Sequence, residues 1–193
     1  MEFERKLAVD TAETLDHILN SPTIQTLLCQ PMAEIPMETV YYGDDAGFLN
    51  AHLWTLRRRM EGDISVITCK TPGDGPYSRC EWEVHCNDLP TGLPLLVEAG
   101  APKELLELTG LHPICGAKFL RRALLLDLGT CKAELALDLG KLFREDREGP
   151  ICELELELKD GEPAAMLELG DRLCAEYNLH DEPKSKFYRA SRL

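Results

Sequence analysis

Polar and apolar residues alternate along much of this chain. A period of two predicts β-strands, because successive side chains of a strand point to opposite faces. In residues 1–9, Glu2, Glu4 and Lys6 fall on one face and mostly apolar residues on the other. Taken alone, such a strand also fits an ordinary sheet whose charged face lies in water. Further strands are expected at residues 38–42, 53–60, 64–70, 78–84, 118–126, 132–139 and 151–158.

Helices are expected at four places. Asp10 and Glu13 have the spacing of an N-terminal capping pair, which predicts a helix at 11–19. Ser21-Pro22 predicts the start of a second helix that ends near Cys29. The other two are a short helix at 103–108 and one with the apolar stripe Met166, Leu169, Leu173 and Tyr177. Pro31, Pro36, residues 71–76 and much of 87–116 are expected in loops or irregular structure.

About eight strands, most of them joined by short turns, predict an α+β fold. The natural architecture is an eight-stranded antiparallel β-barrel, or tunnel, with helices packed outside it. At 193 residues the chain is one large domain or two small ones. It has neither a P-loop nor a G-x-S-x-G motif, so these two kinds of active site are not indicated.

The composition excludes some classes of function. With 34 acidic and 21 basic residues the net charge is −13, so extensive binding of a nucleic-acid backbone is not expected. No apolar run approaches the ~18 residues of a membrane span, and the N-terminus lacks the apolar core of a secretory signal. The eight cysteines are scattered without a C-x-x-C pair. They predict reduced thiols in a cytoplasmic protein and no zinc site.

The charged faces of two strands carry one sign only, whereas a solvated face usually mixes signs: Arg57 and Arg59 share a face of one strand, and Glu153, Glu155 and Glu157 share a face of the other. Like charges side by side on a sheet are destabilising unless something binds them. If these faces point inward, they surround a water-filled cavity, because a dry interior would not tolerate unpaired charges. The carboxylates would be Glu2, Glu4, Glu81, Glu83, Glu134, Asp138, Glu153, Glu155 and Glu157, and the cations Lys6, Arg57, Arg59, Lys70, Arg79, Arg121 and Lys132.

This set of side chains indicates a particular chemistry. Clustered carboxylate oxygens suit Mg²⁺ or Mn²⁺ rather than zinc. Arginine and lysine side chains suit a phosphate chain, and a divalent cation between the two sets is typical of phosphoryl transfer. The residues therefore predict a metal-dependent enzyme acting on a linear polyphosphate or a nucleoside triphosphate. The alternative is a sheet with solvated polar faces, in which alanine substitutions at the carboxylates change stability by at most ~0.5 kcal/mol.

Several motifs resemble one known family. Residues 2–6 (EFERK) resemble the E-x-E-x-K signature of CYTH domains, the triphosphate tunnel metalloenzymes. Residues 150–158 look very like the corresponding segment of bacterial inorganic triphosphatases, and the resemblance runs nearly end to end, which implies one domain over residues 1–193. The other motifs keep the family's order: Tyr41-Tyr42, Leu56–Arg59, Thr68–Lys70, Arg79–Glu83, Phe119–Arg121, Glu134–Asp138 and Ser185-Lys186.

The resemblance implies roles for individual residues. The metal ligands, for Mg²⁺ or Mn²⁺, would be Glu2, Glu4, Asp138, Glu153 and Glu155, with Glu81 or Glu83 as a further contributor. The phosphate-binding cations would be Lys6, Arg57, Arg59, Lys70, Arg121 and Lys186, and Arg79 is added because it shares the charged face. Glu4, Lys6, Arg57, Arg59, Lys70 and Arg121 are the expected catalytic set, and the role of Glu157 stays open.

The expected function is metal-dependent hydrolysis of tripolyphosphate to diphosphate and phosphate. The same family implies alternatives: hydrolysis of thiamine triphosphate or a nucleoside triphosphate, or a class IV adenylyl cyclase. A polyphosphate-binding module without catalysis is a further alternative. An organic group needs an aromatic or apolar shelf, and only Tyr41 or Tyr42 is expected among inward-facing aromatic residues. The scarcity of such residues favours the inorganic substrate. The expected partner is therefore a small molecule, and the sequence leaves the oligomeric state open.

Overall fold

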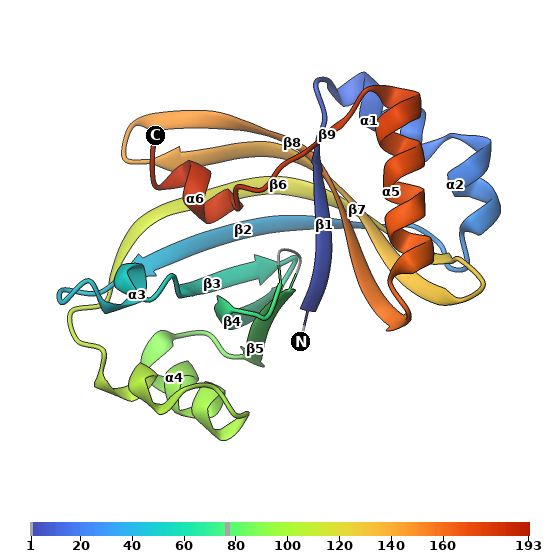
Figure 1. Ribbon diagram of the computed structural model, residues 1–193. Helices are drawn as coiled ribbons and strands as arrows, with labels where there is room; N and C mark the ends of the chain where they lie inside the picture. The colour runs from blue at the N-terminus through green and yellow to red at the C-terminus, as the bar shows by residue number, and fades with distance from the viewer. Residues whose placement is uncertain (1, 76–77) are drawn as a thin grey trace.

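The protein is described here by a computed structural model, in which residues 2–75 and 78–193 are placed. These residues form a closed eight-stranded antiparallel barrel in the order β5-β4-β3-β2-β6-β7-β8-β1, so the predicted fold class is confirmed (Figure 1). Pairing of β1 with β5 closes it, and the short β9 extends the edge of β1. The strands are β1 Glu2–Ala8, β2 Ala33–Gly43, β3 Thr55–Glu61, β4 Ile64–Pro72, β5 Ser78–His85, β6 His112–Asp127, β7 Cys131–Arg144, β8 Arg147–Gly161 and β9 His180–Asp181.

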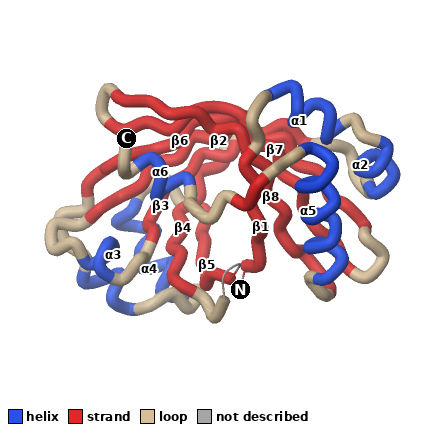
Figure 2. The backbone as a smooth tube through the Cα atoms, turned by 45° about the horizontal axis from the view of Figure 1, so that its top comes forward, coloured by secondary structure: helices blue, strands red, loops and turns tan. Residues whose placement is uncertain are grey.

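Most helices lie outside the barrel in two groups, and the short C-terminal helix α6 lies apart from both, near the end of the chain (Figures 1 and 2). Helices α1, α2 and α5 gather at one side, and α3 and α4 at the other. No helix in the described part of the chain is both long and apolar enough to cross a membrane. The helices are α1 Ala12–Leu19, α2 Pro22–Leu27, α3 Phe48–Ala51, α4 Leu89–Glu98, the 3₁₀ helix η1 Lys103–Glu107, α5 Ala164–Tyr177 and α6 Lys186–Ala190.

The main core explains which strand faces point inward. Leu154 and Leu156 of β8 are fully buried, and they belong to the same apolar cluster as Leu169 and Leu173 of α5 and Leu15 of α1. Burial of a leucine side chain contributes about 1.5–3 kcal/mol, so this outer face of β8 is held against the helices. Because side chains alternate along a strand, the glutamates of β8 must then point to the barrel interior.

A second core holds α4 against β4. Leu93 and Leu96 of α4 pack in one cluster with Ile67 of β4. The two elements approach closely at Gly92, where an added Cβ would lie 2.3 Å from Ile67 Cδ1. This glycine allows a contact that no larger residue could make without displacing the buried isoleucine.

The structure corrects several expectations about the elements. The region 87–116, expected to be mostly irregular, contains α4, whose N-cap Asp88 accepts a hydrogen bond from Thr91 N although Pro94 lies inside the helix. Pro36, expected in a loop, lies in β2, where it pairs with β6 but lies just before the pairing with β3 begins, so no ladder bond is lost on that side.

Smaller differences concern element ends. Thr11, not Asp10, is the N-cap of α1, because its side chain accepts from Thr14 N. Residues 103–107 form a 3₁₀ helix rather than an α-helix, and β6, β7 and β8 are longer than expected. Thr71 and Pro72, expected in a loop, end β4, while Met1 and Pro76 lie outside the described residues.

Candidate functional site

The inner faces of the strands surround a cavity of about 1290 Å³. Charged side chains line it from both sides: the carboxylates Glu2, Glu4, Glu61, Glu81, Glu83, Glu134, Glu155 and Glu157, and the cations Lys6, Arg57, Arg59, Lys70, Arg79, Arg121, Lys159, Lys184, Lys186 and Arg192.

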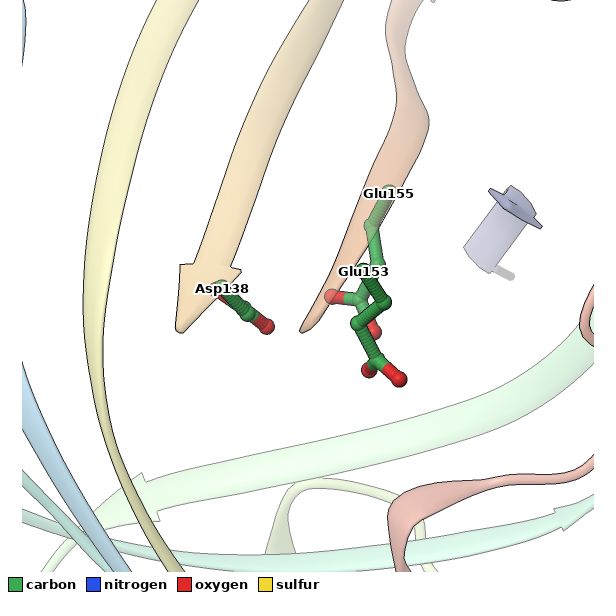
Figure 3. A group of neighbouring side chains, drawn as sticks. All are labelled: Asp138, Glu153 and Glu155. Atoms are coloured by element: carbon green, nitrogen blue, oxygen red, sulfur yellow. The ribbon is translucent and has the colours of Figure 1, made fainter. Parts of the chain in front are cut away.

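Three acidic residues from β7 and β8 form a buried group at this cavity. Asp138, Glu153 and Glu155 each offer one carboxylate oxygen within 4.8 Å of the others (Figure 3). Asp138 and Glu153 are completely buried, and Glu155 is 8% exposed. The register places Asp138 opposite Glu153 on neighbouring strands, so the sheet itself brings the group together.

Cations from β6 and α6 neutralise the acidic group. Arg121 donates two hydrogen bonds to Asp138, at 2.8 and 2.7 Å, and also pairs with Glu155. Lys186 Nζ lies 2.6 Å from Asp138 and 2.8 Å from Glu155, and it contacts Glu153 as well. Burial alone would raise the pKa of Glu155, but the charges of Lys186, Arg121 and Lys6 hold it well below its usual range.

Arg189 of α6 completes this arrangement and was missed in the sequence analysis. Its guanidinium pairs with Glu153, which is fully buried. Arg189 lies three residues after Lys186 and therefore on the same side of the short helix, which is the sequence signal that could have identified it. Three carboxylates thus face three cations, and α6 supplies two of them.

Glu4 of β1 has a different environment. It lines the cavity, and it takes part in no ion pair with any residue that the structure describes. Burial raises the pKa of Glu4 to about 7, and the negative charge of Glu155 adds to the rise against the opposing effect of Lys70 and Lys6. The register places Lys6 opposite Glu155. Glu4 is therefore an acid that lacks a compensating positive charge at close range.

Arg57 and Arg59 of β3 lie at alternate positions and both point into the cavity. Their Nε atoms are buried and have no hydrogen-bond acceptor among the described residues. Burial and the neighbouring charge of Arg57 lower the pKa of Arg59. A buried donor without an acceptor is costly, so this wall is suited to an anion.

A third group of charges joins β1, β4 and β5. Lys70 donates to both carboxylate oxygens of Glu2, at 2.8 and 2.7 Å, and lies 3.2 Å from Glu81. Arg57 donates to Glu81 over 3.4 Å. Glu2 is therefore engaged, while Glu4 on the same strand is not.

Glu157 follows Glu153 and Glu155 at the next alternate position of β8. Its carboxylate lies 2.8 Å from Lys159 Nζ, which is also 3.9 Å from Glu134. Glu157 pairs in register with Glu4 of β1 on one side and with Glu134 of β7 on the other. The structure thus places Glu157 on the cavity wall, beside Glu4 and away from the buried acidic group.

The structure brings most of the expected site residues to one cavity. Asp138 and Glu153 are exceptions, because they lie behind the wall and are engaged by Arg121, Lys186 and Arg189. The expectation for Lys132 is wrong, because this residue is exposed beside a register shift in β7 and does not line the cavity. The residues that line the cavity as expected are Glu2, Glu4, Lys6, Arg57, Arg59, Lys70, Arg79, Glu81, Glu83, Arg121, Glu155 and Lys186, of which Arg79 and Glu83 are exposed.

The expectation that only Tyr41 or Tyr42 faces inward among the aromatic residues is wrong. Phe119, Trp54 and Tyr188 also line the cavity. Lys186 Nζ lies 4.9 Å from the centre of the Phe119 ring. Phe119 lies two residues before Arg121 and so shares its face, a signal that the alternation already contained.

Comparison with known proteins identifies related sequences and folds. The family described as the CYTH domain matches residues 1–191. An inorganic triphosphatase from Haemophilus influenzae is 30% identical over 97% of this chain and 53% of its own length. The chain therefore spans about half the length of this curated relative. The resemblance seen in the sequence motifs is confirmed.

Two solved structures share the fold. A protein from Hippeastrum, described as an adenylyl cyclase candidate with a dominant triphosphatase activity, has a TM-score of 0.69 at 19% identity, covering 100% of this chain and 95% of its own. A protein from Pyrococcus horikoshii OT3 has a TM-score of 0.63 at 19% identity, covering 98% and 97% of the two chains. These likenesses show the fold.

Proposed function

The chain belongs to the CYTH domain family, and we propose that it hydrolyses inorganic tripolyphosphate to diphosphate and phosphate in a metal-dependent reaction inside the barrel. The sequence relation to an inorganic triphosphatase supports this substrate. The eight cysteines are free thiols, which supports the further proposal of a reducing, cytoplasmic setting. We also propose that residues 1–193 form a single domain.

The observation that carries the proposal is two arginine side chains of β3 that pair with carboxylates through Nη2, Arg57 with Glu81 and Arg59 with Glu61, but leave Nε–H without an acceptor among the described residues. Within the part of the chain that the structure describes, these buried Nε–H groups are free to donate into a cavity that acidic residues also line. A phosphate chain supplies acceptors for such donors, and arginine can bind it with two parallel hydrogen bonds.

The carboxylates fit a hard divalent cation, Mg²⁺ or Mn²⁺. Glu4 supports this fit because it lines the cavity without an ion pair among the described residues, and burial, with a further contribution from Glu155, raises its pKa. Glu2, Glu4 and Glu155 would hold the cation from the cavity wall, with Asp138 and Glu153 behind them. When bound, the cation would supply a Lewis acid and an activated water.

The basic residues would handle the phosphate chain. Lys6, Lys70 and Arg121 would stabilise the negative charge that develops on the leaving diphosphate. Because the fold already holds these cations in place, they need not rearrange during the reaction. The remaining binding cations in the proposal are Arg57, Arg59, Arg79 and Lys186. The carboxylates around the cavity form a coupled set, with Glu4 and Glu155 interacting directly, so no single one is assigned as the general base.

A second candidate is a triphosphate with an organic group, and one observation favours it. The ring of Phe48 stacks on His52 at 4.0 Å and meets Trp54 edge-on at 5.3 Å, beside Leu53, which is 76% exposed. Asp44 fixes this turn by accepting hydrogen bonds from the backbone N–H groups of two α3 residues. Trp54 and Leu53 line the cavity, so an apolar shelf adjoins the charged interior.

Phosphate release from tripolyphosphate, ATP and thiamine triphosphate distinguishes the candidates. Each substrate is tested with Mg²⁺, Mn²⁺ or a chelator, using the wild type, Glu4→Ala and Arg59→Met. Lys141→Met is the control, because Lys141 pairs with Glu148 on the exposed outer side. Metal-dependent release chiefly from tripolyphosphate, lost in the first two variants and kept in the control, supports the proposal.

Other outcomes point elsewhere. A preference for thiamine triphosphate or ATP that disappears in Trp54→Ala supports the organic substrate. Formation of a cyclic nucleotide from ATP supports a cyclase. Tight tripolyphosphate binding without release from any substrate supports a binding module.

A further inference from the structure

Arg5 of β1 lies between two site residues of the sequence but points to the opposite side of the strand. It is 7% exposed, although it is a charged residue on the outer face of the barrel wall. Its Nε lies 2.8 Å from Asp181 of β9, and its Nη1 lies 2.8 Å from Asp171 of α5. Nη1 also donates to the Leu167 carbonyl over 3.1 Å. One guanidinium thus joins three elements.

Helix α5 is shaped to admit this guanidinium. Gly170 is buried in the helix interior, and a Cβ there would lie 2.8 Å from Arg5 Nη1. Glycine inside a helix costs about 1 kcal/mol relative to alanine. Gly170 therefore makes α5 intrinsically less stable, but it leaves the space that the Arg5 guanidinium occupies. This indicates that the contact between Arg5 and α5 depends on close packing.

The connection from β9 leads directly to the site. Asp181 pairs in register with Leu7 of β1, and Glu182 N donates to the Lys6 carbonyl over 2.9 Å. The next residues, 183–185, line the cavity and lead to α6, which begins at Lys186. Asp181, which pairs with Arg5 outside the barrel, is thus only five residues before Lys186, which pairs with the acidic group inside it.

We propose that Arg5 is a positioning residue: by binding Asp181 it fixes the segment that carries α6, so that Lys186 and Arg189 are held at the cavity. The consequence for catalysis rests on the proposed function, while the consequence for α6 does not. Among the described residues, Arg5 neither lines the cavity nor pairs with Asp138, Glu153 or Glu155, so it acts through the segment that it anchors.

A simpler role for Arg5 is to hold α5 on the barrel. The two carboxylates separate these roles, because each lies 2.8 Å from the same guanidinium and both are solvent-accessible, at 73% for Asp171 and 50% for Asp181. Asp171→Asn weakens the hold on α5, and Asp181→Asn weakens the hold on the segment that leads to α6. Each variant is the matched control of the other.

The first measurement is amide hydrogen exchange of residues 182–190 in metal-free protein without substrate. We expect Asp181→Asn to accelerate exchange in this segment and Asp171→Asn to leave it unchanged. The second measurement is steady-state hydrolysis of tripolyphosphate. Asp181→Asn should raise KM roughly fivefold, the size expected from losing one partly exposed ion pair, with kcat changed less.

Equal effects of the two variants on the exchange of 182–190, or no effect of either, would overturn the proposal. Arg5→Lys, which keeps the charge but can satisfy fewer partners, should accelerate exchange less than Arg5→Met. If Arg5→Met does not fold, the asparagine pair still decides. If the wild type releases no phosphate from tripolyphosphate, the proposed function fails, and the exchange result alone tests the positioning role.

Discussion

Replacing Glu4 by glutamine is expected to stabilise the metal-free protein at pH 8 and to abolish its metal-dependent hydrolysis. Burial raises the pKa of Glu4 to about 7, and the charges of Glu155 and Glu2 add to this rise. Lys70 and Lys6 oppose it without cancelling it. Glutamine keeps the shape and removes the charge, so one substitution should affect stability and function in opposite directions.

The sign follows from the two pKa values of Glu4. Its pKa in the unfolded chain is 4.5, and its pKa in the folded protein is about 7, so the folded state binds more protons between these values. The contribution of Glu4 to stability is fully present below pH 4.5 and is lost as the pH rises through 7. At about 1.4 kcal/mol per pH unit the loss is at most roughly 3.5 kcal/mol, and water in the cavity reduces it.

Thermal unfolding in a chelating buffer at pH 5 and pH 8 measures this effect. Glu4→Gln should unfold at a higher temperature than the wild type at pH 8, by roughly 2–4 °C for each kcal/mol, and near the wild-type temperature at pH 5. Glu83→Gln is the control, because Glu83 lines the same cavity but is exposed. It should leave the unfolding temperature unchanged at both pH values.

Two results would refute the reasoning about Glu4. A lower unfolding temperature of Glu4→Gln at pH 8 would mean that the ionised carboxylate is compensated in the metal-free protein. Unchanged phosphate release in the presence of Mg²⁺ or Mn²⁺ would mean that Glu4 does not hold the cation. The first result bears on the electrostatics of the cavity and the second on the proposed role.

Three further substitutions test other parts of the structure. Arg57→Met should weaken tripolyphosphate binding roughly 10- to 100-fold by calorimetry, because charge-assisted hydrogen bonds contribute about 1.5–3 kcal/mol, and unchanged affinity would count against the β3 wall. Lys186→Met leaves Asp138 and Glu153 with less compensating charge and should destabilise by about 3–5 kcal/mol in denaturant titration, whereas a loss below ~1 kcal/mol would contradict a buried network. Gly92→Ala should destabilise by about 1–3 kcal/mol with phosphate release per folded molecule unchanged, since its Cβ would strike the buried side chain of Ile67, and equal stability would show that α4 can shift.

Much of the barrel could be predicted from local pattern. The period of two decides which side chains of a strand share a face, so the grouping of Arg57 with Arg59, and of Glu153 with Glu155, needs no tertiary information. The opposite, apolar faces of these strands must be buried against helices, and the apolar stripe of α5 packs against β8 in this way. The α+β fold follows from these two facts, whereas the pattern alone left open whether the charged faces point inward or into water.

Local pattern failed where a tertiary contact overrides propensity. Pro94 discourages a helix, yet α4 forms because its apolar side chains pack against β4. Pro36 suggests a loop, yet it lies in β2 at a place where only one neighbouring strand pairs with it. The cost of a proline thus depends on its surroundings, because packing against β4 offsets it in α4 and the N–H of Pro36 is not needed on the β3 side.

The sequence by itself determined which charged residues share a strand face, because alternation is a local property of the backbone. Only the tertiary structure decided how these charges are paired. It sets Lys186 and Arg189 against the buried acidic group and leaves Glu4 without an ion pair among the described residues. The reason is physical: electrostatic energies depend on distance and burial, and partners such as Arg5 and Asp181, 176 positions apart, meet only when the barrel closes.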